Sequence, residues 1–155
     1  MERKNEGQPA QGYVQEFNIL ATDSTIYNAI TQAIPKWWSS TFEGNSSAKG
    51  DTFTVRFGND VFKTIEVTAI NPDQYIVWQV KNAEINVPGL INRQEWIGTS
   101  IHWGLLPDAS GTKLILTHVG LTPEIECYDM CTAGWMQFLT SLKQYCETGT
   151  GNPFR

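Results

Sequence analysis

The sequence has few cysteines and histidines, no long apolar run and no excess of positive charge. Its 155 residues include 3 cysteines and 2 histidines, and the formal net charge is -5. Nucleic acids bind to basic surfaces, so this charge argues against a nucleic-acid partner. No apolar stretch approaches the roughly 20 residues that a bilayer span needs, and the polar N-terminus lacks the apolar segment of a secretory signal. We therefore expect a cytoplasmic protein with no membrane partner.

The cysteines do not form a recognisable framework. Three is an odd number, which favours reduced thiols over a disulfide scaffold. Cys127 and Cys131 lie four residues apart in an expected helix, where two thiolates would share one face. No second pair completes a tetrahedral metal site, and a buried free cysteine usually behaves as a small hydrophobic residue. We expect neither a metal nor another cofactor.

The composition is that of one folded domain. Hydrophobic residues make up 41% and charged residues 17%, and 6 tryptophans supply large rigid apolar surfaces. The polar, glycine-containing start predicts a mobile tail over residues 1–11. A single domain is expected over residues 12–150, followed by a short C-terminal tail over residues 151–155.

Hydrophobic periodicity predicts the order of the elements. Alternation indicates a first strand, and a 3.6-residue stripe after the N-cap Thr22 indicates a helix that Pro35 ends, with a second short helix after it. Turn residues then separate five further alternating segments. The predicted strands cover residues 13–21, 52–57, 61–70, 75–81, 94–106 and 112–119. A long helix is expected from Pro123 to about Glu147, with Gly149 as its terminator.

This order defines the α+β class. Short turns between strands imply an antiparallel sheet, and helices grouped at the two ends of the chain imply layers of sheet and helix. The last helix, on the order of 35 Å long at 1.5 Å per residue, would cross the whole sheet. A long helix on a curved sheet leaves a space between them, where pockets form.

The chain resembles the START-like (SRPBCC) superfamily with its helix-grip fold, and within it the group related to the activator of the heat-shock-protein-90 ATPase. Each motif is short, but their order extends from Tyr13 to Gly149. The motifs are Ala29-Ile30-Thr31, Trp37-Trp38, Gly50 with Phe53-Thr54-Val55, Trp96 with Gly98-Thr99, Gly111-Thr112-Lys113-Leu114 with Leu116-Thr117-His118, and Gly134-Trp135 with Phe138, Leu139, Ser141, Leu142 and Lys143.

The resemblance implies a curved antiparallel sheet wrapped around the C-terminal helix, two short helices after the first strand, and an apolar cavity. It implies binding of a small hydrophobic or amphipathic molecule, the kind of ligand that members of the superfamily take. Inward positions on the predicted strands and on the last helix indicate the lining residues Phe53, Phe57, Trp78, Trp103, His118, Tyr128 and Trp135. Trp37, on the second short helix, is expected at the mouth of the cavity. Each of these aromatic residues is equally compatible with an ordinary core.

Two alternatives remain open. A cyclase-like or dehydratase-like enzyme would use His118 as acid or base, because it shares a strand face with Leu114 and Leu116 and therefore points inward. Its partners would come from Arg93 or Glu95, whereas His102 points outward and has no expected role. No nucleophile triad, metal motif or phosphate loop supports catalysis.

The second alternative is an interaction protein whose partner is a chaperone or another protein. Trp37-Trp38 would then be an exposed anchor, because aromatic side chains are common at the centres of interfaces. The competing interpretation is that these two tryptophans close the mouth of the cavity.

Overall fold

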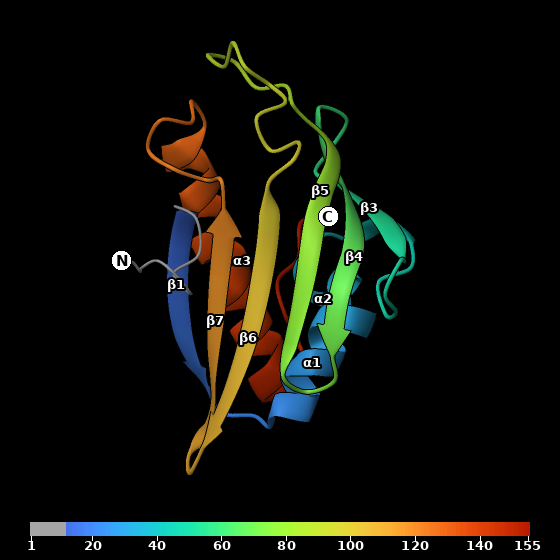
Figure 1. Cartoon of the computed structure of the whole chain (residues 1–155), viewed down its shortest axis with the longest axis vertical. Coiled ribbons are helices and arrows are strands. Elements are labelled where there is room, and N and C mark those ends of the chain that lie inside the picture. The colour runs from blue at the N-terminus through green and yellow to red at the C-terminus, as the bar shows by residue number, and fades with distance from the viewer. Residues whose placement is uncertain (1–11) are drawn as a thin grey trace, which may run out of the picture.

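The computed structural model describes residues 12–155, and the predicted tail over residues 1–11 lies outside them. Seven strands form one antiparallel sheet, and the helices lie together on one face of it (Figure 1). The elements in chain order are β1 (Gly12–Ile19), α1 (Asp23–Gln32), α2 (Ile34–Trp37), β2 (Thr41–Gly44), β3 (Thr52–Arg56), β4 (Val61–Asn71), β5 (Tyr75–Ile85), β6 (Ser100–Asp108), β7 (Gly111–Val119) and α3 (Tyr128–Thr148). This is the α+β helix-grip architecture that the sequence predicts.

The strand order is β1-β7-β6-β5-β4-β3-β2, so every neighbour except the β1-β7 pair is also a neighbour in sequence. All six pairings are antiparallel. The β4-β5 ladder shifts register between Thr64 and Ile65 and again between Val67 and Ala69. Irregularities of this kind bend a strand and increase its twist, which lets the sheet curve around α3.

Alternation along the strands decides which side chains form the core. On β5, Ile76, Trp78 and Val80 are buried, and on β7 the alternate positions from Thr112 to His118 are buried. The opposite faces of these strands remain wholly or partly accessible. The inward direction predicted for Trp78 and His118 is therefore confirmed.

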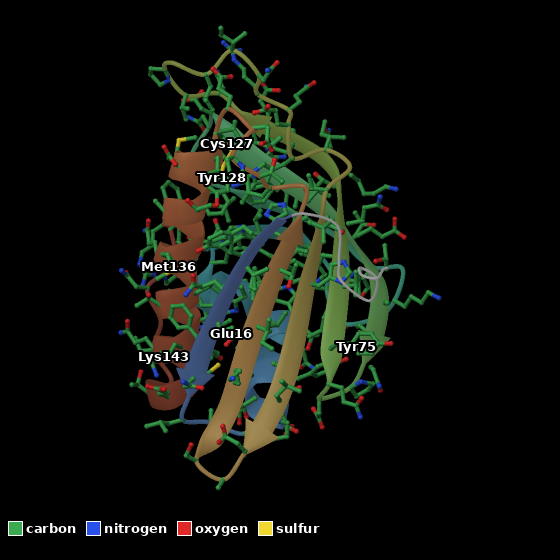
Figure 2. The ribbon with its side chains drawn as sticks, turned by 60° about the vertical axis from the view of Figure 1, so that its left-hand side comes forward. Glu16, Tyr75, Cys127, Tyr128, Met136 and Lys143 are labelled. Carbon is green, nitrogen blue, oxygen red and sulfur yellow. A yellow bond between two sulfur atoms is a disulfide. The ribbon has the colours of Figure 1, made fainter. Side chains whose placement is uncertain are left out.

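The helices begin and end largely where local chemistry predicts. The Thr22 hydroxyl accepts a hydrogen bond from the backbone of Thr25 at 3.1 Å and caps α1, and Pro35 occupies the first turn of α2. Gly149 ends α3 in the left-handed conformation at φ 87°. Figure 2 shows α3 lying along the concave side of the curved sheet, with Met136 directed away from the strands.

One strand was missed, and two elements begin later than predicted. The exposed edge strand β2 was not predicted, because only Phe42 among its four residues is even partly buried and the segment carries no alternating pattern. The strand expected from residue 94 begins at Ser100, since Gly98 has a positive φ of 87° and residues 94–99 form turns.

The long helix begins at Tyr128 rather than at Pro123. Tertiary hydrogen bonds hold the preceding segment in turns. The Glu126 carboxylate accepts hydrogen bonds from the backbone N–H groups of Ile91 and Asn92. The backbone N–H of Glu126 donates to the Glu95 carboxylate at 2.9 Å. These contacts tie residues 121–127 to residues 90–95, so that the local capping signal at Thr122 does not start the helix.

The C-terminal residues pack against the start of β2. The Phe154 backbone exchanges hydrogen bonds with Trp38 and Ser40, and Pro153 is buried. The Phe154 ring lies 5.6 Å from that of Phe57. Residues 151–155 thereby reach the space between the sheet and α3.

Candidate functional site

Four of the predicted lining residues fill the interior instead. Trp37, Phe53, Trp78 and Trp103 are at most 1% exposed and contact one another at ring-centroid distances between 5.1 and 5.9 Å. These contacts are edge-to-face, an arrangement that sets the positive edge of one ring against the negative face of another. The four rings form a continuous aromatic core under the middle of the sheet, and none of them lines the pocket described below.

Trp38 extends this core toward α3. Its ring stacks on Trp37, Trp78 and Trp135 at 5.8, 5.8 and 5.5 Å, and it is 2% exposed. The alternative in which Trp37 and Trp38 form an exposed anchor is therefore wrong, because both indoles are buried. The alternation rules for strands do not apply to these residues, so the sequence alone did not decide their direction.

His118 is buried and its two ring nitrogens are both hydrogen-bonded. The Trp135 indole N–H donates to Nδ1 at 3.0 Å. Because Nδ1 accepts, the proton of the neutral ring is on Nε2, which donates to the Thr99 hydroxyl at 2.9 Å. That hydroxyl donates in turn to the carbonyl of Trp96 at 2.7 Å. This hydrogen-bond network connects α3, β7 and the loop before β6 through one neutral imidazole.

Burial and, to a smaller extent, the nearby Lys63 ammonium together lower the pKa of His118 to about 3. A protonated ring would also place a second N–H against the Trp135 indole N–H. His118 points inward as predicted, but it is 0% exposed and does not reach the pocket. Its geometry is that of a residue that positions Trp96 and Trp135.

A pocket of about 380 Å³ lies between the sheet and the N-terminal half of α3. Its walls come from the start of β4, the end of β5, the loop that follows, α3 and the C-terminal segment. The lining residues are Trp38, Phe57, Val61, Lys63, Ile85, Val87, Trp96, Met130, Cys131, Gly134, Trp135, Gln137, Phe138 and Phe154. Of the eight residues predicted from the sequence, Phe57 and Trp135 belong to it.

Tyr128 lies at the start of α3, where it is partly buried against the core and does not line the pocket. Figure 2 places it and Cys127 at the end of the helix nearest the long loop after β5. The expected partners of His118 also lie elsewhere: Arg93 is exposed and pairs with Glu84 at 3.9 Å, and Glu95 accepts from the Glu126 backbone. Both precede the observed start of β6, and neither lines the pocket.

Lys63 is the charged group of the pocket wall. It is partly buried on the inner face of β4, and its ammonium lies 4.5 Å from the Phe57 ring centre and 4.4 Å from that of Trp96. Burial lowers the pKa of Lys63 to about 7. The sequence carried a usable signal, since Val61, Lys63 and Ile65 have the same parity on a strand with one buried face, but a lysine is not ordinarily placed in a core.

Cys127 and Cys131 form a disulfide across the first turn of α3, and Cys146 is free. The expectation of unpaired thiols is therefore wrong for this pair. The tertiary turn before α3 brings the Cys127 sulfur onto that of Cys131, and the Trp96 indole N–H lies 3.3 Å from the Cys131 sulfur. Within residues 12–155 no group of three or more His, Cys, Asp or Glu side chains is placed to hold a metal ion.

The other pocket residues absent from the sequence prediction come from segments that are far apart in the chain. Val87, Trp96 and Phe154 lie in a loop or at the C-terminus, where no periodicity shows direction. Gly134 was noted only for its place in a motif. An added Cβ there would meet no atom within 4 Å, so this glycine opens the helix surface to the pocket.

A seven-stranded antiparallel sheet curved around a long C-terminal helix, with a pocket between the layers, defines the START-like class. The match of residues 21–147 to a family model places the chain in a specific group within it. The protein belongs to the family described as activator of Hsp90 ATPase homolog 1-like protein. A comparison with curated proteins gave no match.

Solved structures show the same fold. The chain is similar to the Aha1 dimer from Colwellia psychrerythraea, with 27% identity, a TM-score of 0.74, and coverage of 91% of this chain and 99% of that one. Protein MLL2253 from Mesorhizobium loti is 23% identical, with a TM-score of 0.71 and coverage of 86% and 95%. DynU16, described as a putative protein in the dynemicin biosynthetic locus, is 21% identical with a TM-score of 0.66, and the match covers 92% of this chain and 49% of that one.

Proposed function

We propose that this protein binds a small hydrophobic or amphipathic molecule in the pocket between β4 and α3. The observation that supports this is the pocket itself, about 380 Å³ in volume, whose described lining is apolar except for Lys63 and Gln137. Ligand sites typically enclose about 300–1,000 Å³ and combine apolar walls with a few polar groups. Burial of roughly 300 Å² of apolar ligand surface would contribute about 7 kcal/mol before the entropy cost of association.

Binding in the pocket can be followed by tryptophan fluorescence. Trp38, Trp96 and Trp135 line it, so that a molecule entering it replaces water near three indoles. The neutral probe N-phenyl-1-naphthylamine becomes fluorescent in apolar surroundings and carries no charge that a lysine would attract. We expect saturable probe fluorescence and a matching change in tryptophan emission.

The deciding experiment compares probe binding before and after a side chain is built into the pocket. Gly134→Leu places a side chain where no atom lies within 4 Å of the added Cβ, and it replaces glycine by a better helix former. The variant should fold and lose probe binding by tenfold or more. Ala133→Leu is the matched control, because Ala133 is exposed on the same helix and does not line the pocket. Equal probe binding by both variants would show that the molecule binds elsewhere.

A chaperone-directed function is the second proposal, supported by the description of the matched family as Hsp90 ATPase activator-like. It does not depend on the pocket and is tested by titrating purified heat-shock protein 90 with this protein while its ATPase rate is measured. A rise in rate that Gly134→Leu leaves intact would favour this function. An unchanged rate, with no binding by calorimetry, would exclude it for that partner.

An acid-base enzyme centred on His118 is not proposed. The ring is 0% exposed, both of its nitrogens are hydrogen-bonded, and its lowered pKa of about 3 keeps it neutral at physiological pH. Proton transfer to a ligand would require the reacting atom to come within hydrogen-bond reach of a nitrogen that Trp135 or Thr99 already occupies.

A further inference from the structure

The lysine in the pocket wall lies in unusual surroundings. Its cross-strand neighbours are Val55 on β3 and Ala83 on β5, both buried and apolar. The ammonium lies beside the rings of Phe57 and Trp96, each within 4.5 Å of the ring centre. Aromatic faces stabilise a cation, but they supply no lone pair for an N–H donor.

No carboxylate from residues 12–155 neutralises this charge. Lys81, Lys113 and Lys143 each lie within 4.0 Å of a glutamate oxygen, whereas desolvation is the cause of the lowered pKa of Lys63 and no counter-ion offsets it. An ammonium carries three N–H donors, and a partly buried charge without a partner is costly. The site is therefore arranged so that an anion brought into the pocket would complete it.

Resting on the binding function proposed above, we propose that the ligand of this pocket carries a carboxylate that pairs with the Lys63 ammonium while its apolar body lies against Trp96, Trp135 and Phe138. The ligand class is thus an amphipathic organic acid. A charge-assisted hydrogen bond of this kind corresponds to roughly a tenfold to hundredfold difference in binding constant.

Proton linkage gives the proposal a distinctive signature. In the free protein the pKa of Lys63 is about 7, and a bound carboxylate raises it toward its ordinary value, so binding above neutral pH takes up a proton. Affinity for the acid should fall by up to about tenfold per pH unit above pH 7.

No other group near Lys63 in residues 12–155 should titrate between pH 6 and 9 and add to this pH dependence of the affinity. The polar or sulfur-containing side chains that α3 contributes to the pocket besides Met130 and Trp135 are Gln137, which does not titrate, and Cys131, which is in a disulfide. His118 behind Trp96 is neutral over this range because burial lowers its pKa to about 3. Each of the two neighbouring strands presents an apolar residue, as described above.

The experiment compares two probes of equal length, decanoic acid and decan-1-ol, by displacement of N-phenyl-1-naphthylamine at pH 6, 7.5 and 9. The intact protein should prefer the acid at pH 6 by tenfold or more and lose that preference at pH 9. Lys63→Met should abolish the preference and leave affinity for the alcohol within about threefold. Lys63→Arg should keep it at all three pH values, because the guanidinium does not deprotonate in this range.

Lys81→Met is the matched control, since it removes the same charge from an exposed position on β5 and should leave the acid preference unchanged. Equal affinity for acid and alcohol in the intact protein would overturn the proposal while leaving the binding function in place. Displacement by neither probe, together with no binding of the neutral dye, would overturn both. An acid preference that Lys63→Met and Lys81→Met reduce equally would also overturn it, because it would reflect overall charge.

Discussion

Protonation of His118 should be a principal cause of acid unfolding. The neutral ring accepts from Trp135 and donates to Thr99, and it is fully buried. Its pKa is lowered to about 3 in the folded protein, whereas the pKa of a histidine in an unfolded chain stays near its ordinary value of 6.5. The unfolded state therefore binds a proton first. The contribution of His118 to stability is complete above about pH 6.5 and is lost as pH falls toward 3.

The magnitude follows from that difference. A difference of one in pKa between the folded and unfolded states corresponds to 1.36 kcal/mol of unfolding free energy. Between pH 7 and pH 4 the folded protein does not yet protonate His118 while the unfolded chain does, so about 3 kcal/mol of stability is lost to this one residue. That is a large fraction of the roughly 5–15 kcal/mol by which domains are stable.

The assay is urea unfolding followed by tryptophan fluorescence at pH 7, 5.5 and 4, for the intact protein and for His118→Asn. An asparagine oxygen lies near the position of the imidazole Nδ1 and accepts from Trp135, but the side chain does not titrate. The variant should be less stable at pH 7 by about 1–3 kcal/mol, because ring contacts with Trp96 are lost. Between pH 7 and 4 it should then lose about 3 kcal/mol less than the intact protein.

The exposed His102 gives the matched control. Its pKa is also lowered by burial, but it lies on the outer face of β6 with a hydrogen bond to Ser100. His102→Asn should therefore change the pH dependence much less than His118→Asn. If both variants retain the full acid sensitivity of the intact protein, then carboxylates cause the unfolding and the account of His118 given above is refuted.

Three further variants test other parts of the structure. Gly120→Ala should cost about 2 kcal/mol or more in urea unfolding, because φ is 100° and the added Cβ would lie 2.7 Å from Thr99; an unchanged midpoint would contradict that geometry. Unfolded protein should show one reactive thiol before reduction and three afterwards, and Cys127→Ser with Cys131→Ser should lower stability by about 2 kcal/mol; three thiols without a reductant would exclude the disulfide. Thr22→Ala should lower the melting temperature by an amount corresponding to about 1 kcal/mol, and no change would mean that the cap on α1 is not formed.

Local patterns predicted the order of most elements and the direction of their side chains. The alternation on β5 and β7 placed Trp78 and His118 inside, and the cap at Thr22 marked the start of α1. The same rules failed where tertiary hydrogen bonds replaced local ones. Glu126 accepts from residues 35 and 34 positions earlier in the chain, a contact that no local pattern contains, and it keeps residues 122–127 out of the helix.

Local patterns also could not separate the residues of the pocket from those of the core. Periodicity makes every inward aromatic residue an equal candidate for the pocket lining. A side chain that fills the core and one that borders a pocket have the same position on a strand or helix. Trp78 packs in the core against Phe53 and Trp103, whereas Phe57 lines the pocket.

The class of fold, the buried faces and the inward direction of His118 could be predicted from local patterns, since these follow from periods of two and 3.6 residues. Where space remains depends on tertiary packing. It opened the pocket beside Gly134, brought Trp96 and Phe154 to its walls, and placed Lys63 among aromatic rings. The physical reason is that a pocket is bounded by segments distant in the chain, and the distances between them depend on how whole layers pack.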